Sequence, residues 1–254
     1  MDGVRVYRDP GPGILKGSPA HPFNVSAVVF DLFITLTDFD IERQRPQMTA
    51  ELAHALHVDP EAFSSLMRNT FTARTTGATG DLYTTLEGMA RSLGGRPTPE
   101  VIYRTVALRI AQERRLLTPR ADVLDTLARL KSSGYRIGVI TDCTVELPGL
   151  WPTLPYADLV DGTVFSCDLG CRKPAAALYV ASAHGLGVPI ERCLYIGDGG
   201  SQELSGAASA GMITAMLKTP FGDDFRYDAE RDWQGLILEG IADVMSLVRL
   251  SANS

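Results

Sequence analysis

Residues 27–36 have the sequence Ala27-Val28-Val29-Phe30-Asp31-Leu32-Phe33-Ile34-Thr35-Leu36, and this stretch decides the fold. Its first four residues form a short apolar run that is typical of a strand buried on both faces. The run ends at a carboxylate, Asp31. Strands buried in this way belong to parallel sheets that carry helices on both sides, so the stretch predicts an α/β protein.

Apolar runs of the same kind recur later in the chain. Helical segments separate most of them, and strands that alternate with helices imply right-handed crossovers and a parallel sheet. The predicted fold class is therefore α/β, with a Rossmann-like, doubly wound parallel sheet. The later runs cover residues 136–140, 163–165, 193–196 and 213–217.

Residues 41–116 interrupt this alternation, because they form four consecutive amphipathic segments with no strand between them. The first helix is expected to open at Pro46. Asp59-Pro60 and Thr98-Pro99 each supply an N-cap and a first-turn proline, for the second and fourth helices. This pattern predicts a smaller, inserted, all-helical domain, after which Thr118-Pro119 is expected to start the helix that returns to the sheet.

The predicted organisation of the chain has four parts. Residues 1–24 form a leader rich in Gly and Pro. Residues 25–40 contain the first strand of the core and the flap that follows it. Residues 41–116 form the helical domain, and residues 117–254 complete the Rossmann-like core.

The composition excludes several classes of protein. The chain has 254 residues, 45% of them hydrophobic, and its mean hydropathy is +0.03, as expected of a chain that buries a full core. A net charge of −6 makes nucleic acid an unlikely partner. No apolar stretch is long enough to span a bilayer and no secretion signal is recognisable, so we expect a cytoplasmic protein with no membrane partner. The four cysteines are expected to be free thiols. The sequence makes no prediction of the oligomeric state.

Polar residues stand where several of the predicted strands end. Ligands of open parallel sheets bind at the carboxyl ends of the strands, so these residues are expected to face a ligand. Asp31, Thr141-Asp142 and Asp198 each end a strand, and Lys173 precedes a proline that opens a helix. The sequence thus predicts that two carboxylates, one lysine and one hydroxyl converge.

Such a set of residues favours phosphoryl transfer. Mg²⁺ between two carboxylates removes their repulsion and also accepts phosphate oxygens. Asp31 is then placed to attack the phosphoryl group and form an aspartyl-phosphate. Lys173 is expected to stabilise the charge on the transferring group, and the Thr141 hydroxyl is expected to hold its oxygens.

The order and spacing of these residues resemble the haloacid dehalogenase-like (HAD-like) hydrolase superfamily over residues 26 to about 217. Residues 30–36 are similar to the first motif of that family, with Asp31 as the nucleophile. The second and third motifs are matched by Thr141 and Lys173-Pro174, and the fourth by Gly197-Asp198 with Glu203. The helical insertion resembles the cap domain that closes over the site in the family and selects its substrate.

The resemblance also implies a role for each residue. Asp31 and Lys173 are expected to be catalytic. The implied metal ligands for Mg²⁺ are the Asp31 carboxylate, the backbone carbonyl of Phe33, and Asp198.

Further residues are expected around this centre. Thr35, Thr141 and Asp142 are expected to bind the substrate, a small phosphorylated molecule, although Asp142 could instead cap the segment that follows it. Glu203 is expected either to contact Lys173 from outside the metal site or to complement the dipole of its own helix.

Phe33 departs from the family pattern. Phosphatases of the family normally have a second aspartate at this position, which protonates the leaving group, and phenylalanine cannot do so. A placed acid typically contributes 10²–10⁴-fold, so substrates with good leaving groups are favoured unless another acid serves. Candidate acids from the helical insertion are Glu42, His54 and His57, although the two histidines are more simply structural.

The same departure leaves two other functions open. Dehalogenases and phosphonate-cleaving members of the family also lack this aspartate. The metal-binding type of fourth motif argues against the dehalogenases, and the lack of a recognisable cap lysine argues against phosphonate cleavage. A third alternative is a protein that binds a phosphorylated ligand with little turnover. Elsewhere in the insertion, Arg109, Arg114 and Arg115 with Glu113 are expected to form a solvated face.

Overall fold

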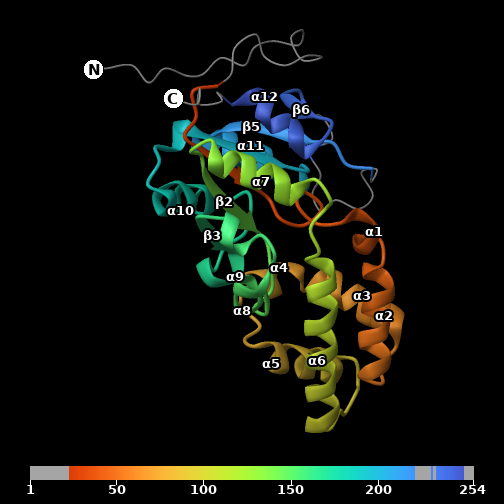
Figure 1. Cartoon of the computed structure of the whole chain (residues 1–254). Coiled ribbons are helices and arrows are strands. Elements are labelled where there is room, and N and C mark those ends of the chain that lie inside the picture. The colour runs from red at the N-terminus through yellow and green to blue at the C-terminus, as the bar shows by residue number, and fades with distance from the viewer. Residues whose placement is uncertain (1–22, 221–229, 231–232, 249–254) are drawn as a thin grey trace, which may run out of the picture.

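A six-stranded parallel sheet forms the centre of the protein, with the strand order β3-β2-β1-β4-β5-β6. The computed structural model describes residues 23–220, 230 and 233–248. Helices flank the sheet (Figure 1), which confirms the predicted α/β class and the doubly wound sheet. The strands are β1 (Ala27–Phe30), β2 (Arg136–Thr141), β3 (Gly162–Phe165), β4 (Cys193–Gly197), β5 (Ile213–Leu217) and β6 (Leu236–Leu238).

The first strand lies at the point where the order of the strands reverses. From β1 the chain continues to β2 and β3 on one side of the sheet, and then returns to β4, β5 and β6 on the other. Phe30 at the end of β1 pairs with Val139 of β2 and with Ile196 of β4. Crevices at such switch points are the usual ligand sites of open α/β sheets, and Asp31 stands at this one.

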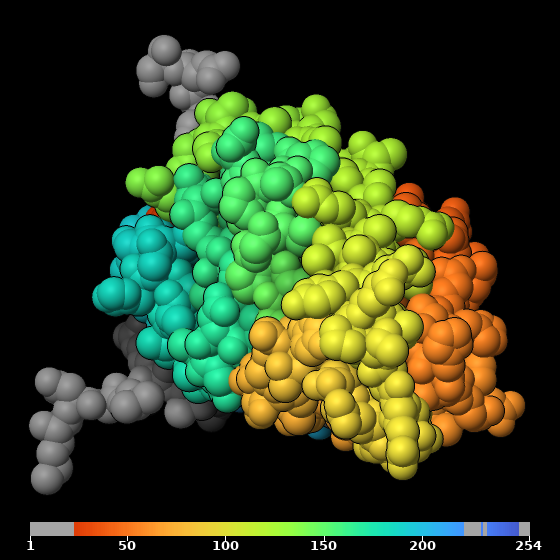
Figure 2. All heavy atoms as spheres, turned by 90° about the horizontal axis from the view of Figure 1, so that it is seen from below, coloured from red at the N-terminus to blue at the C-terminus, as the bar shows by residue number. Residues whose placement is uncertain are grey.

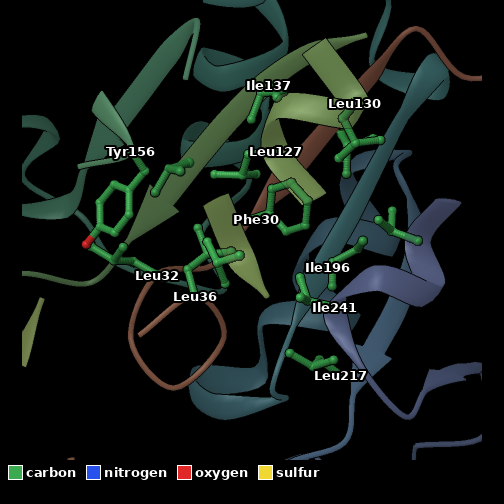
Figure 3. Packing of buried hydrophobic residues seen from close by; sticks show 14 of the residues in the cluster. Phe30, Leu32, Leu36, Leu127, Leu130, Ile137, Tyr156, Ile196, Leu217 and Ile241 are labelled. Carbon is green, nitrogen blue, oxygen red and sulfur yellow. The ribbon is translucent and has the colours of Figure 1, made fainter. Parts of the chain in front are cut away.

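Successive residues of β1 are buried on opposite faces of the sheet. Val28 and Phe30 belong to a core cluster with Leu127 and Leu130 of the helix α7 (Val123–Ser132), whose side chains point toward Phe30 in Figure 3. Ala27 and Val29 belong to a second cluster, on the face covered by α10 (Ala176–Leu186) and α11 (Glu203–Ala210). Burial on both faces explains why β1 is apolar throughout.

Helices occupy the chain between β1 and β2, and those that precede α7 extend away from the sheet in Figure 1. Asp59 and Thr98 cap two of them as expected, by accepting hydrogen bonds from the backbone N–H groups of Ala62 and Val101. The short helix α1 (Phe39–Glu42) comes first. The insertion then comprises α2 (Arg45–Ala55), α3 (Pro60–Asn69), α4 (Phe71–Thr75), α5 (Leu82–Ser92) and α6 (Pro99–Leu116).

Two details of this region differ from the expectation of four helices. The second predicted helix breaks at Thr70, so its last residues form the separate helix α4. The hydroxyl of Thr70 bonds back to the carbonyl of Leu66, and such bonds compete with regular helix geometry. The short helix α1 precedes the insertion and is capped by Asp38.

One further expectation needs correction, one strand was not expected, and one predicted segment lies mostly outside the described residues. The helix that returns to the sheet begins at Val123 rather than at Thr118-Pro119, because Pro119 pairs with Thr37 in an isolated antiparallel bridge. Strand β6 was not predicted from the sequence. Most of the expected leader, residues 1–22, lies outside the described residues.

Among the described residues, no helix combines the length and apolar character that crossing a bilayer requires.

The helices of the insertion have a core of their own, and they also contact the sheet domain. Phe63 of α3 is fully buried among side chains of α2, α5 and α6. The space-filling view in Figure 2 shows the yellow spheres of α5 and α6 against the green spheres of the segments that follow β2. One contact is the hydrogen bond from the Ser166 hydroxyl to the Thr75 carbonyl, at 2.6 Å.

Replacement of Phe63 by alanine tests the separate core of the insertion. Phe63→Ala should lower the free energy of unfolding by about 3–5 kcal/mol, because it leaves a cavity in this cluster. Val180→Ala removes an exposed side chain from α10 and should stay within about 0.5 kcal/mol of the wild type. Urea unfolding followed by circular dichroism measures both, and equal stability of the two variants would contradict the packing described.

Candidate active site

Asp31 follows β1 and is 5% exposed. Its backbone N–H continues the ladder to β4, donating to the Ile196 carbonyl at 2.9 Å. Its two carboxylate oxygens have different partners. One accepts a hydrogen bond from the Lys173 ammonium, and the other accepts one from the Thr35 hydroxyl at 3.0 Å. Asp31 is therefore held in one orientation at the carboxyl end of the central strand.

Lys173 connects this carboxylate to Glu203. Its ammonium donates to Asp31 and, at 2.5 Å, to Glu203. Burial disfavours the charged ammonium, but the negative charges of Asp31 and Glu203 prevail and raise the pKa of Lys173 well above its ordinary value. The lysine is thus a permanent cation between two carboxylates.

Glu203, the first residue of α11, is fully buried and has hydrogen bonds to both carboxylate oxygens. One oxygen accepts from Lys173 and from the Tyr195 hydroxyl at 2.8 Å, and the other accepts from the Gly199 N–H at 2.9 Å. This position requires Gly197, because a Cβ there would lie 2.1 Å from a Glu203 oxygen. Burial raises the pKa of Glu203 to about 7, although Lys173 opposes the shift.

Asp198 completes a group of three buried acids. Oxygens of Asp31, Asp198 and Glu203 all lie within 4.8 Å of one another, an arrangement that could hold a metal ion. Burial and the charge of Glu203 raise the pKa of Asp31 to about 7, even though Lys173 lowers it. Three carboxylates with one ammonium leave a net negative charge when ionised, and a divalent cation with oxygen ligands would balance it.

The loop after Asp31 is sharply bent. Ile34 has a φ of 69°, in the left-handed region that β-branched residues rarely adopt. The bend leaves the Phe33 side chain beside the cavity above Asp31, with the guanidinium of Arg45 5.2 Å from the centre of its ring. No carboxylate occupies this position of the loop, as the sequence indicated.

The three residues expected to bind substrate lie in different environments. Thr35 is fully buried beneath Asp31 and is not part of the cavity wall. Thr141 ends β2, and its buried hydroxyl has no hydrogen-bond partner in the described part of the chain. Asp142 lines the cavity and accepts hydrogen bonds from the Lys173 N–H at 3.0 Å and from Arg172 at 3.3 Å. Asp142 thereby fixes the backbone that carries Lys173.

A cavity of about 440 Å³ lies between the insertion and the sheet domain, with Asp31, Lys173 and Asp198 among the residues that line it. Of the three candidate acids, Glu42 lines the cavity, but it is in an ion pair with Arg45. His54 and His57 are exposed and are not among the lining residues. The cavity therefore lies over the candidate nucleophile, and the insertion forms its other wall.

The expectation of a solvated arginine face is wrong for Arg109 and its partner Glu113. Arg114 and Arg115 are exposed, but Arg109 is buried and pairs with Glu113 at 2.7 Å and with Glu146 at 2.8 Å. Glu146 follows β2, so it supplies a partner from the other domain that helical periodicity cannot reveal. This buried ion pair connects α6 to the loop after β2.

Two residues of the site were missed in the sequence. Tyr195 belongs to an apolar strand and has the pattern of a core residue, yet its hydroxyl donates to Glu203. Arg172 contacts Asp142 and the Ser201 hydroxyl, and its guanidinium lies 5.0 Å from the centre of the Phe71 ring on α4. In the sequence, Arg172 could have been assigned to the site because it is next to Lys173. No sequence feature indicated that Tyr195 belongs to the site.

Comparison with known proteins agrees with this geometry. The family model for haloacid dehalogenase-like hydrolases matches residues 25–211, which include Asp31, Lys173 and Asp198. The chain belongs to this family. HAD-like hydrolases are enzymes, so the protein is a hydrolase by family, and the resemblance noted in the sequence is confirmed.

Similar proteins include enzymes of more than one activity. A relative from Methanopyrus kandleri, named glyceraldehyde 3-phosphate phosphatase, is 25% identical over 63% of this chain and 70% of its own length. The L-2-haloacid dehalogenase of Xanthobacter autotrophicus has a similar fold, with a TM-score of 0.62, 18% identity and coverage of 90% of this chain and 100% of its own. A HAD family enzyme from Bacteroides thetaiotaomicron, solved with magnesium and inorganic phosphate, has a TM-score of 0.58 at 16% identity and covers 79% and 97%.

The raised pKa of Asp31 predicts how one substitution changes stability. The unfolded chain ionises this carboxyl near its ordinary pKa of 3.8, whereas the folded protein does so only near pH 7, so an ionised Asp31 destabilises the metal-free fold at higher pH. With chelator at pH 8, Asp31→Asn should therefore raise the melting temperature by at least about 2–4 °C, and this gain should shrink toward pH 4. Differential scanning calorimetry measures both values.

A matched control for this experiment is Asp125→Asn, which changes an exposed carboxylate on α7. Its melting temperature should follow the wild type at both pH values. A lower melting temperature for Asp31→Asn at pH 8 would contradict the view that burial of this carboxylate is unfavourable.

Proposed function

We propose that the protein is a Mg²⁺-dependent hydrolase of a small organic phosphate, which acts through an aspartyl-phosphate at Asp31. The observation that carries this proposal is the group of Asp31, Asp198 and Lys173 at the floor of the cavity, with Glu203 buried beneath them. Its excess negative charge and oxygen donors fit a hard divalent cation. The name of the M. kandleri relative supports a small phosphorylated substrate.

The ligands for the metal follow from the hydrogen bonds of the three acids. Both oxygens of Glu203 are engaged by Lys173, Tyr195 and Gly199, so Glu203 is proposed to orient Lys173 rather than to bind the metal. Asp31, Asp198 and the backbone carbonyl of Phe33 are the proposed ligands. When bound, Mg²⁺ would neutralise charge on the phosphoryl oxygens and on the carboxylates.

In the proposed mechanism Asp31 is the nucleophile. One of its oxygens attacks phosphorus, the bond from phosphorus to the leaving oxygen breaks, and an acyl phosphate forms on Asp31. Lys173 balances the charge on the transferring group. The buried Thr141 hydroxyl does not line the cavity, but it has no partner among the described residues and is proposed to donate to one of the phosphoryl oxygens. Water then attacks phosphorus, which releases phosphate and restores the carboxylate.

The insertion over residues 41–116 is proposed to act as the cap. It supplies one wall of the cavity, and its contacts with the core through Thr75 and Arg109 would keep bulk water from the acyl phosphate. A cytoplasmic location and the absence of a nucleic-acid partner stay predictions from the sequence.

Release of phosphate from a panel of phosphomonoesters and acyl phosphates tests the proposed function. The wild type should turn over at least one of them with Mg²⁺ and none with chelator. Asp31→Asn should retain less than about one thousandth of this activity, since it removes the nucleophile. Asp125→Asn again serves as the control and should retain full activity.

Other outcomes of this experiment would contradict the proposal. Full turnover by Asp31→Asn would exclude Asp31 as the nucleophile. Phosphate bound tightly without turnover would support a binding protein. Halide released from a 2-halo acid in the presence of chelator would support the dehalogenase alternative, which is favoured by one observation, the aromatic Phe33 at the edge of the cavity.

Phe33→Asp tests whether the missing acid limits the rate. The new carboxyl would stand two residues after the nucleophile, where it can protonate a leaving alkoxide. For alkyl phosphates, kcat should rise by about 10²-fold, and for good leaving groups it should change little. The control Phe33→Asn introduces a side chain of the same shape as aspartate but without the acid, so it should not raise kcat. The measurement is kcat across a series of aryl and alkyl phosphates. This account would be contradicted if kcat depended equally on leaving-group pKa in the wild type and in Phe33→Asp.

A further inference from the structure

Four arginines of the insertion line the cavity, and they differ in their partners. Arg45 is in an ion pair with Glu42, and Arg109 is in ion pairs with Glu113 and Glu146. Arg68 is exposed and donates to two serine hydroxyls. The fourth, Arg74 of α4, is only 8% exposed and has no carboxylate within ion-pair distance in the described part of the chain.

The backbone and side chains of α3 and α4 fix the orientation of Arg74. Its Nε donates to the Thr70 hydroxyl at 3.2 Å, and one terminal nitrogen donates to the Met67 carbonyl at 2.7 Å. Its second terminal nitrogen makes no hydrogen bond to the described residues. Arg74 thus presents a preformed donor to the cavity, and its charge is not matched by an adjacent anion.

The surroundings of Arg74 disfavour its charged form. Burial, reinforced by the positive charge of Arg109, lowers the pKa of Arg74 to about 10. The negative charges of Glu146 and Glu113 oppose this shift only in part, because both glutamates are in ion pairs with Arg109 and neither lies within ion-pair distance of Arg74. A buried cation without a counterion destabilises a protein unless a ligand supplies the counterion.

We propose that Arg74 binds a second anionic group of the substrate, so that the substrate is a small organic phosphate that also carries a carboxylate or a second phosphate. This inference rests on the proposed function, because Asp31 and Lys173 take the reacting phosphoryl group at the opposite wall of the same cavity. A guanidinium binds either kind of anion through paired, charge-assisted hydrogen bonds.

The rest of the wall suits the short carbon chain between the two anions. Met67, Phe71 and Leu52 line the cavity beside Arg74, and its volume of about 440 Å³ is within the range of small-molecule sites. Glyceraldehyde 3-phosphate, in the name of the M. kandleri relative, has an uncharged aldehyde end. The proposed substrate of this chain therefore differs from glyceraldehyde 3-phosphate in having a second anionic group.

Three substrates that share a glycerol-type skeleton test the inference. They are 3-phosphoglycerate, with a carboxylate; 2,3-bisphosphoglycerate, with a carboxylate and a second phosphate; and glycerol 3-phosphate, with an uncharged end. With Mg²⁺, the wild type should have a kcat/KM for one of the first two at least about 10-fold above that for glycerol 3-phosphate. A higher value for 2,3-bisphosphoglycerate than for 3-phosphoglycerate would show that a second phosphate adds to the recognition of the carboxylate.

Arg74→Met should remove this preference. It should raise KM for the preferred substrate, which has a second anionic group, by about 10–100-fold and leave kcat/KM for glycerol 3-phosphate within about 3-fold. Arg74→Lys retains the charge and should recover part of the preference. The control Arg104→Met removes an exposed arginine that is paired with Glu100 on α6, and it should match the wild type. Equal losses in Arg74→Met for the substrates with a second anionic group and for glycerol 3-phosphate would overturn the inference.

A binding experiment keeps the inference separate from the proposed function. Calorimetry with Mg²⁺ compares phosphonoacetate, which has a carboxylate, with methylphosphonate, which has none. Arg74→Met should weaken phosphonoacetate binding by at least about 10-fold and leave methylphosphonate unchanged. This result would support the anion site even if no phosphate ester were turned over, whereas unchanged phosphonoacetate binding would overturn it even in an active phosphatase.

Discussion

The candidate active site depends on one constraint, the burial of three carboxylates around a single ammonium. Asp31 and Asp198 can meet only because β1 and β4 are adjacent parallel strands that end at the same edge of the sheet. Lys173 then holds Asp31 and Glu203 together, and Tyr195 reaches Glu203 from within β4. Gly197 leaves the space that this glutamate occupies. The sheet register, the glycine that ends β4 and the buried Tyr195 all shape the same cluster.

The insertion adds a second charged layer over this cluster. Arg109 bridges α6 to Glu146 of the core, and Arg172 of the core lies against Phe71 of α4, so both walls of the cavity are joined by contacts of charged side chains. Buried ion pairs add little net stability but fix orientation, which is what a site that must exclude water requires. Against this background Arg74 is an exception, because hydrogen bonds fix its geometry while no carboxylate of the described residues lies within ion-pair distance of it.

Features set by local pattern could be predicted from the sequence, and features set by tertiary contacts could not. The strands that surround Asp31 were predicted because each is apolar throughout, and capping residues such as Asp59 marked helix starts. Strand β6 was missed because three apolar residues are too few to show a period. Arg109 was expected to be solvated because its partner Glu146 is distant in the sequence, and the hydrogen bonds of Asp142 depend on the fold of a loop 30 residues away.

The central claim is that Asp31 carries the phosphoryl group during turnover, and the most direct measurement is its trapping. The enzyme with Mg²⁺ and its best phosphate substrate is quenched in acid within one turnover, digested and analysed by mass spectrometry. The account predicts a phosphoryl group on the peptide that contains Asp31, which forms in the wild type and is absent from Asp31→Asn. Phosphate released at full rate with no phosphoryl group on Asp31, or with one on another residue, would contradict it.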